Sequence, residues 1–282
     1  VICLAPEGPG LQVTPACGFK APVTSLEAAV QSMADAMTQL HRSPGVDFVM
    51  DQEGTSDRKL PSCRIIPERG SWIEVNVTKK DTLSIRIDQS GKFSAITLLR
   101  AMSPKYGTDS DIIRAFYEPT VEKIVDGRSV AKIDGKVAVD DIVYPASGER
   151  PGEIIIEAGQ KITKAIAEII VTAGVTKVEV MVAPKVPVLL NSIGDDATHS
   201  HEEALLRIYQ RLRPGNPPQL EKARTLFNEK FFDVNRYRLG RVGRFRISRK
   251  LKLDISDKEM TLRPEDLIAA IKYLSELMVS GG

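Results

Sequence analysis

Alternation of apolar and polar residues predicts an antiparallel hairpin between residues 62 and 88. In residues 72–78 every second side chain is apolar, a period of two that gives a strand one apolar face. Residues 83–88 alternate in the same way, and the polar residues 79–82 lie between the two runs. Because polar residues are typical of hairpin turns, we expect two antiparallel strands joined through residues 79–82.

Helical spacing replaces this alternation in several later segments. Apolar residues recur every three or four positions there, as in helices with one buried face. Thr108 and Asp109 are capping candidates for the second helix, and Arg213–Pro218 forms a rigid break after the third. The predicted helices are Ser94–Met102, Asp109–Phe116, Glu202–Leu212, Pro218 to about Phe232, and a final helix from Arg263 onward.

Residues 121–187 read as an insertion made of short elements. Ile154–Ile156 predicts a strand, Thr163–Ala173 a helix closed by Gly174, and Val175–Val182 a second strand. This order predicts a small inserted α+β subdomain. The fold class expected for the whole chain is α+β, with mixed short antiparallel sheets and helices.

The first 38 residues differ from the rest. Prolines and glycines interrupt any periodicity, which predicts a loop-like, poorly ordered lead-in with one short helix from Ser25 to Met33. The predicted organisation is therefore a lead-in over 1–38 and one domain over 39–282, with 121–187 inserted into it.

Composition is that of a globular protein, with 42% hydrophobic and 27% charged residues. The three cysteines are widely spaced, which favours a reducing compartment over a disulfide framework. No run approaches the roughly 18 apolar residues that a membrane span needs. We expect a cytoplasmic protein with no membrane partner.

Charge is distributed unevenly along the chain. Residues 207–252 hold fourteen basic and three acidic residues, a net charge of +11, so the rest carries −9 of the total of +2. Such asymmetry is typical of a surface that meets a polyanion.

Residues 236–246 interleave arginines with aromatic residues and glycines. Two interpretations stand equal on composition alone. In one, the arginines hold phosphates while aromatic rings stack on bases. In the other, Val242 and Phe245 are buried in a hairpin and the arginines pair with carboxylates. Trp72, the only tryptophan, is a further candidate for stacking, although a lone tryptophan more often belongs to a core or an interface.

Independent catalysis has little support in the sequence. It contains no phosphate-binding glycine loop, no dinucleotide fingerprint and no carboxylate cluster suited to magnesium. His199 and His201 flank Ser200, but a third metal ligand is provided only by the neighbouring Glu202 and Glu203. We predict no catalytic, cofactor-binding or metal-binding residues.

Several long strings resemble the lobe domain of the bacterial RNA polymerase β subunit, in the same order as in that family. Together they cover roughly residues 39–280 and are highly specific. They are Gln39–Val46, Cys63–Trp72, Arg86–Asp88, Leu98–Ala101, Ile208–Pro218, Leu226–Phe232 and Arg236–Arg244. The chain departs from the family at Gln89–Gly91, where a usual basic run is replaced and only Lys92 remains.

The resemblance implies one jaw of a DNA cleft, facing downstream duplex and the non-template strand. Arg42 and Trp72 match positions that meet non-template bases, and Arg213 and Arg236 match arginines that approach the same strand. The arginine-rich run adds three further candidates to the predicted DNA-binding set, Arg238, Arg241 and Arg244.

The family also implies partners and an activity. The β′, α and σ subunits would complete a DNA-directed RNA polymerase, a nucleotidyltransferase whose magnesium and catalytic aspartates lie on β′. We expect an inactive β-subunit fragment with an unmatched head. The alternative function is a scaffold that docks initiation or elongation factors without gripping DNA.

Overall fold

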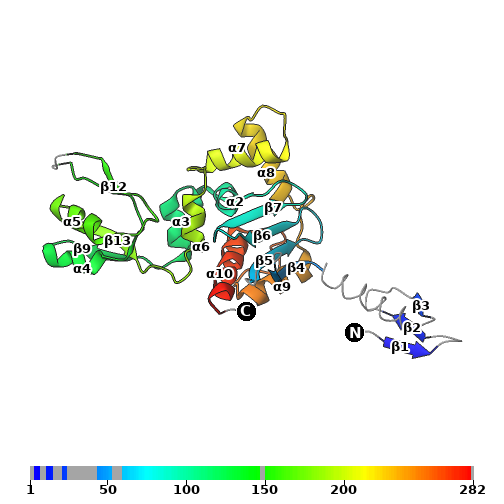
Figure 1. The fold of residues 1–282 in the computed structure, drawn as a ribbon. Helices are drawn as coiled ribbons and strands as arrows, with labels where there is room; N and C mark the ends of the chain where they lie inside the picture. The colour runs from blue at the N-terminus through cyan, green and yellow to red at the C-terminus, as the bar shows by residue number, and fades with distance from the viewer. Residues whose placement is uncertain are drawn as a thin grey trace.

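A computed structural model describes residues 3–6, 11–14, 21–23, 43–52, 59–146 and 150–280. Its architecture is α+β with short antiparallel sheets, which confirms the predicted fold class (Figure 1). Three strands that the sequence did not predict form a small antiparallel sheet: β1 (Cys3–Pro6), β2 (Leu11–Thr14) and β3 (Ala21–Val23). The helix predicted from 25 to 33 lies outside the described residues.

A five-stranded antiparallel sheet forms the centre of the molecule. Its strands follow chain order: β4 (Gly45–Gln52), β5 (Lys59–Ile66), β6 (Ile73–Val77), β7 (Leu83–Ile87) and β8 (Phe93–Ser94). The predicted hairpin is confirmed as β6–β7, with Ile73 opposite Ile87 and Val77 opposite Leu83. Every second residue of both strands is buried, as the alternation requires.

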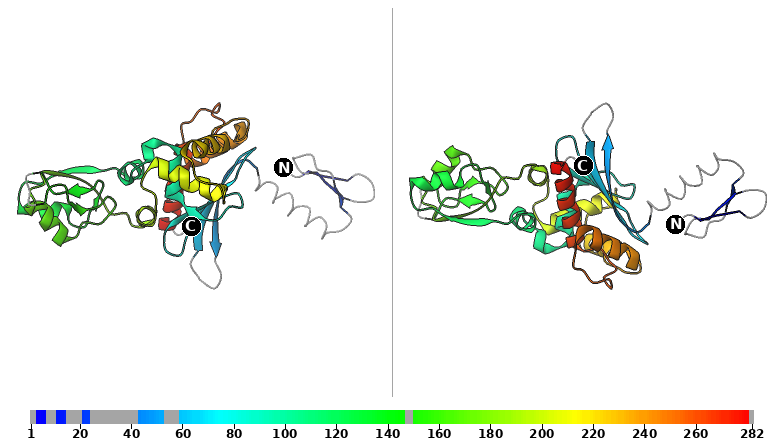
Figure 2. Two further views of the ribbon diagram at one scale, coloured as in Figure 1. Left: turned by 90° about the horizontal axis from the view of Figure 1, so that it is seen from above. Right: turned by 90° about the horizontal axis from the view of Figure 1, so that it is seen from below.

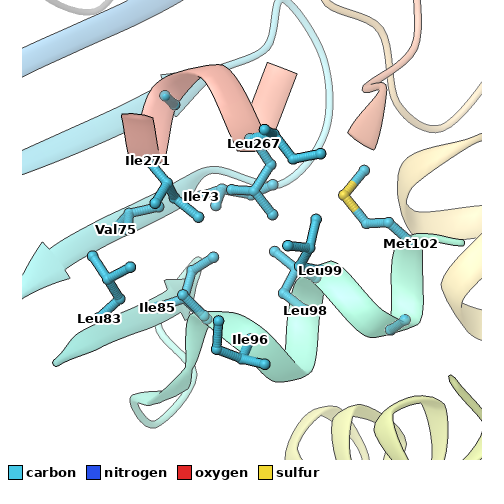
Figure 3. Packing of buried hydrophobic residues seen from close by; sticks show 14 of the residues in the cluster. Ile73, Val75, Leu83, Ile85, Ile96, Leu98, Leu99, Met102, Leu267 and Ile271 are labelled. Atoms are coloured by element: carbon cyan, nitrogen blue, oxygen red, sulfur yellow. The ribbon is translucent and has the colours of Figure 1, made fainter. Parts of the chain in front are cut away.

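Two helices cover the apolar face of this sheet. They are α2 (Ala95–Met102) and α10 (Pro264–Ser280). Figure 3 shows Ile73 and Ile85 of the sheet beside Leu99 of α2 and Ile271 of α10. All eight residues of α2 are buried, and the side chain of Ser94 accepts a hydrogen bond from the Ile96 amide at its N-terminus. Helix α2 therefore lies inside the hydrophobic core.

The remaining helices of the main body lie around this core. α7 and α8 contact one another at one end of the molecule (Figure 1). Among the described residues the predicted helices are present within about two residues of their expected ends, whereas η1, α6 and α9 were not predicted. The elements are η1 (Pro104–Tyr106), α3 (Asp109–Phe116), α6 (Val188–Gly194), α7 (His201–Leu212), α8 (Leu220–Phe231) and α9 (Gly240–Leu251).

The inserted segment builds sheets and a core of its own. Its strands pair in the orders β10-β13-β9 and β11-β12, and Figures 1 and 2 show it to one side of the central sheet. Ile133, Ile170 and Val180 belong to its separate apolar cluster. Its elements are β9 (Thr120–Lys123), η2 (Gly127–Ser129), α4 (Val130–Ile133), β10 (Val137–Ala138), β11 (Ile142–Val143), β12 (Ile154–Ile156), α5 (Lys164–Thr172) and β13 (Lys177–Met181). The exact domain boundaries stay a prediction.

A buried charge ties α2 to the loop before α7. Arg100 is 1% exposed, and its Nε lies 3.3 Å from Oδ2 of Asp196. The hydroxyls of Thr97 and Thr198 each donate to Asp196 at 2.6 Å. Arg100 also donates to the Gly107 carbonyl at 2.6 Å and pairs with Asp109. This network satisfies a charge that would otherwise be costly inside the core.

The neighbouring aspartates Asp195 and Asp196 allow a matched test of this network. We expect Asp196→Ala to lower the free energy of unfolding by about 3 kcal/mol, because it leaves Arg100 and two hydroxyls without their shared acceptor. Asp195 is exposed, so Asp195→Ala should change the free energy of unfolding by less than about 0.5 kcal/mol. Urea titration of both variants measures the difference, and equal losses would contradict the assigned role.

Candidate nucleic-acid interface

A short backbone bridge brings together two segments that are far apart in the sequence. The Arg69 amide donates to the Arg238 carbonyl at 3.0 Å, and the Arg238 amide donates back at 2.7 Å. Gly70 makes this approach possible, since a Cβ there would lie 2.8 Å from Cδ2 of Tyr237 and 3.1 Å from the Arg236 carbonyl oxygen. Its φ of +119° also suits glycine. The Trp72 loop therefore lies beside the arginine-rich run.

Trp72 has a fixed backbone and an accessible ring. Its amide donates to the Asp88 carboxylate at 2.8 Å, while the Asp88 amide donates to the Trp72 carbonyl at 2.9 Å. Lys230 Nζ of α8 donates to the same carboxylate at 3.2 Å. The tryptophan, which directly precedes β6, is 40% exposed. An aromatic side chain that is open to solvent and attached to a fixed backbone is suited to base stacking.

A hollow of about 480 Å³ lies beside this ring. Arg64 pairs with Glu74 at 3.1 Å on its wall, and Nε of Arg86 is buried without a hydrogen-bond partner in the described structure. The hollow thus combines an aromatic ring with guanidinium groups. Its lining consists of Arg64, Gly70, Trp72, Ile73, Glu74, Arg86, Asp88 and Gln89.

Three predicted arginines lie on the surface near the bridge. The Arg236 side chain is 62% exposed and pairs with Glu229 at 2.7 Å, and Arg238 pairs with Glu68 at 3.1 Å. Arg241, on the first turn of α9, is exposed and has no ion pair among the described residues. Exposed ion pairs contribute only about 0–1 kcal/mol, so Arg236 and Arg238 can exchange carboxylates for phosphates at little cost.

One other predicted residue, Arg213, lies apart from this group. Arg213 follows α7 as its exposed C-terminal cap, and no described contact joins it to Trp72 or to the Arg69–Arg238 bridge. Arg42 lies outside the described residues. Of the predicted set, the structure gathers Trp72, Arg236 and Arg238, with Arg241 following in the chain.

Arg244 has a different role from the one predicted. It is fully buried, and its Nη1 lies 2.5 Å from Oδ1 of Asp266, which is buried as well. Its Nε and Nη2 donate to the carbonyls of Glu259 and Thr261 at 2.8 and 2.5 Å. Burial raises the pKa of Asp266, and the Arg244 guanidinium opposes that rise. Arg244 therefore holds α9 against α10 and does not face a ligand.

The arginine-rich run also differs from the hairpin considered above. From Gly240 it forms α9, and the structure leaves Val242 63% and Phe245 58% exposed. Gly243 packs where a Cβ would lie 3.0 Å from Pro44. The buried residues Leu239 and Ile247 lie eight positions apart, with Gly243 midway between them. This four-residue spacing is the signal that could have predicted the helix. It was missed because the middle position of the buried face is a glycine and not an apolar side chain.

His199 and His201, the two histidines among the described residues, flank the start of α7. Nδ1 of His201, the first residue of α7, lies 2.7 Å from the Arg100 carbonyl oxygen. Among the described residues there is no group of three or more histidine, cysteine, aspartate or glutamate residues able to hold a metal ion. Within that part of the chain, no helix is long and apolar enough to cross a membrane.

Comparison with known proteins gives a consistent result. The family model for RNA polymerase Rpb2, domain 2, matches residues 185–281. A DNA-directed RNA polymerase subunit beta from Rhodopirellula baltica is 68% identical over 241 residues, covering 86% of this chain. The chain belongs to the RNA polymerase β-subunit family.

More distant β subunits cover the chain to the same extent. The subunit from Chlamydia pneumoniae is 38% identical over 248 residues, and that from Protochlamydia amoebophila is 36% identical over 253. They cover 86% and 87% of this chain. The chain spans about a fifth of the length of these β subunits, 19% of the Rhodopirellula baltica protein.

The bridge predicts a large effect of a small substitution. We expect Gly70→Ala to lower the free energy of unfolding by about 1–3 kcal/mol, because the methyl group meets Tyr237 and the Arg236 backbone at an unfavourable φ. Gly152 has a φ of +79°, and a Cβ at that position would have no atom within 4 Å, so Gly152→Ala is a control for a positive φ without a close neighbour. Urea titration should show a larger loss for Gly70→Ala, and equal losses would contradict the close approach.

Proposed function

We propose that this β-subunit segment forms one jaw of the DNA cleft of a DNA-directed RNA polymerase, contacting downstream duplex and the non-template strand. The observation that carries the proposal is the exposed Trp72 ring on the loop whose Arg69 is hydrogen-bonded to Arg238 of the arginine-rich run. The net charge of +11 over residues 207–252 supplies the long-range attraction for a polyanion.

The chemistry fits a single strand whose bases are unstacked. An aromatic ring stacks on any base, so Trp72 would hold a strand without reading its sequence. Arg236, Arg238 and Arg241 present planar forks that match phosphate oxygens in pairs. Arg213, exposed at the end of α7, and Arg42 complete the proposed set, from which Arg244 is removed by its burial.

The same proposal assigns partners and activity to the assembled enzyme. The β′, α and σ subunits would complete a nucleotidyltransferase, with magnesium held by β′ and this chain gripping the nucleic acid. Under this proposal the chain contributes binding and positioning, and the isolated chain incorporates no nucleotide.

A second candidate function rests on the inserted segment. Val121, Val125 and Val182 of this segment are 61%, 83% and 76% exposed. Exposed apolar side chains suit docking of a protein factor better than contact with DNA. Under this alternative the chain serves as a scaffold and the arginines bind no strand.

Titration of a labelled single-stranded oligonucleotide into the full chain tests the proposal. We expect Trp72→Ala to weaken binding about 5- to 150-fold, the loss of one stacked base. Arg236→Gln combined with Arg241→Gln should reduce the slope of log affinity against log salt by about 1.4, because two phosphate contacts are lost.

Arg128→Gln is a control for the loss of an arginine elsewhere on the surface, since Arg128 is exposed in the inserted segment. It should leave both the affinity and the salt slope unchanged. Loss of affinity in Arg128→Gln equal to that in the Arg236/Arg241 variant would support nonspecific attraction and contradict the proposed surface. No binding by the unmodified chain would favour the scaffold.

A further inference from the structure

A second and larger hollow lies on the other end of the β6–β7 hairpin, with a volume of about 610 Å³. It is bounded by the hairpin turn at residues 78–82, by residues 92–94 and by α7. None of its lining residues lines the hollow beside Trp72. The two hollows are therefore separate sites.

Most of the charged side chains that line this larger hollow are cationic. Five exposed basic residues line it: Lys79, Lys80, Lys92, Arg207 and Arg211. The only carboxylates in its lining are Asp195 and Asp196. Both carboxylate oxygens of Asp196 accept hydrogen bonds from Thr97, Thr198 and Arg100, so its charge is already compensated. Within the lining, Asp195 is thus the one carboxylate left to face this group of cations.

Four of these five cations have no ion pair in the part of the chain that the structure describes. Among the described residues Lys80, Lys92, Arg207 and Arg211 form no ion pair, whereas Arg224 on the adjacent helix α8 pairs with Glu202 and Glu221. Arg207 and Arg211 are four positions apart on α7, a spacing at which like charges repel. An anion between them would relieve that repulsion.

Several other polar groups of the hollow already have hydrogen-bond partners. The hydroxyls of Thr78 and Thr82 lie 2.7 Å apart, and Ser84 donates to the Asn76 carbonyl at 3.4 Å. Buried Leu83 and Phe93 supply apolar wall. The cationic groups left to bind a ligand are lysine ammonium and arginine guanidinium groups, which favour phosphate oxygens.

We propose that this hollow, which we call the lysine–arginine hollow, binds a chain of phosphoryl groups through Lys80, Lys92, Arg207 and Arg211. Two sources share that chemistry, a free polyphosphate and the phosphodiester backbone of a nucleic acid. The proposal is independent of Trp72 and of the surface assigned to strand stacking. The proposal adds an anion-binding site next to the turn of the β6–β7 hairpin.

Calorimetric titration of the full chain with inorganic tripolyphosphate tests this site. The variant Arg207→Gln/Arg211→Gln should bind tripolyphosphate at least tenfold more weakly. Lys80→Gln/Lys92→Gln, which alters different elements, should lose affinity in the same direction. Lys222→Gln/Arg224→Gln on α8 removes the same charge outside the hollow and should bind like the unmodified chain, as should Trp72→Ala.

Titration of the same variants with a single-stranded oligonucleotide distinguishes the two sources. Weaker oligonucleotide binding with a salt slope reduced by about 1.4 in Arg207→Gln/Arg211→Gln identifies the phosphodiester backbone. Unchanged oligonucleotide binding with weakened tripolyphosphate binding identifies a free polyphosphate. The proposal is overturned if neither ligand loses affinity in this variant, or if the Lys222/Arg224 control loses as much. Unchanged thermal unfolding midpoints ensure that folded proteins are compared.

Discussion

The ion pair between Arg244 and Asp266 is the constraint on which the arginine-rich surface depends. Both side chains are fully buried, and the guanidinium also satisfies two carbonyls of the connection between α9 and α10. Removing either partner would leave an uncompensated charge in the core, which fixes α9 in one position. With α9 fixed, its preceding segment can bridge to Arg69 and lie beside Trp72. Arg244 is therefore buried and contacts no ligand, and its ion pair holds the neighbouring arginines of the basic run in place.

Local patterns predicted much of the fold. Alternation of side chains defined the β6–β7 hairpin because one face of that sheet is buried. Capping residues marked the start of helices such as α3, where the side chain of Thr108 accepts a hydrogen bond from the Asp111 amide. Strand β4 was not predicted because it depends on pairing with β5. Helix α9 was not predicted because its buried face includes a glycine packed on Pro44.

The candidate site was less accessible to sequence reasoning. Residue types identified Trp72 and the arginines, but exposed and buried arginines look alike in a sequence. The acidic partner of Arg244 lies 22 positions away, at Asp266. The Gly70 approach and the lysine–arginine hollow both arise from tertiary contacts between distant segments. The structure therefore divides one basic run into a structural arginine, a surface near Trp72, and the arginines of α7 that face a second hollow.

Photocrosslinking tests most directly whether the assembled surface holds a strand. A single-stranded oligonucleotide with a photoreactive base would be bound to the full chain and irradiated, and the modified peptides identified by mass spectrometry. Crosslinks should concentrate on peptides containing Trp72 and residues 236–241, because the Arg69–Arg238 bridge places them together. Crosslinks confined to the inserted segment, or spread evenly over exposed lysines and arginines, would contradict the account.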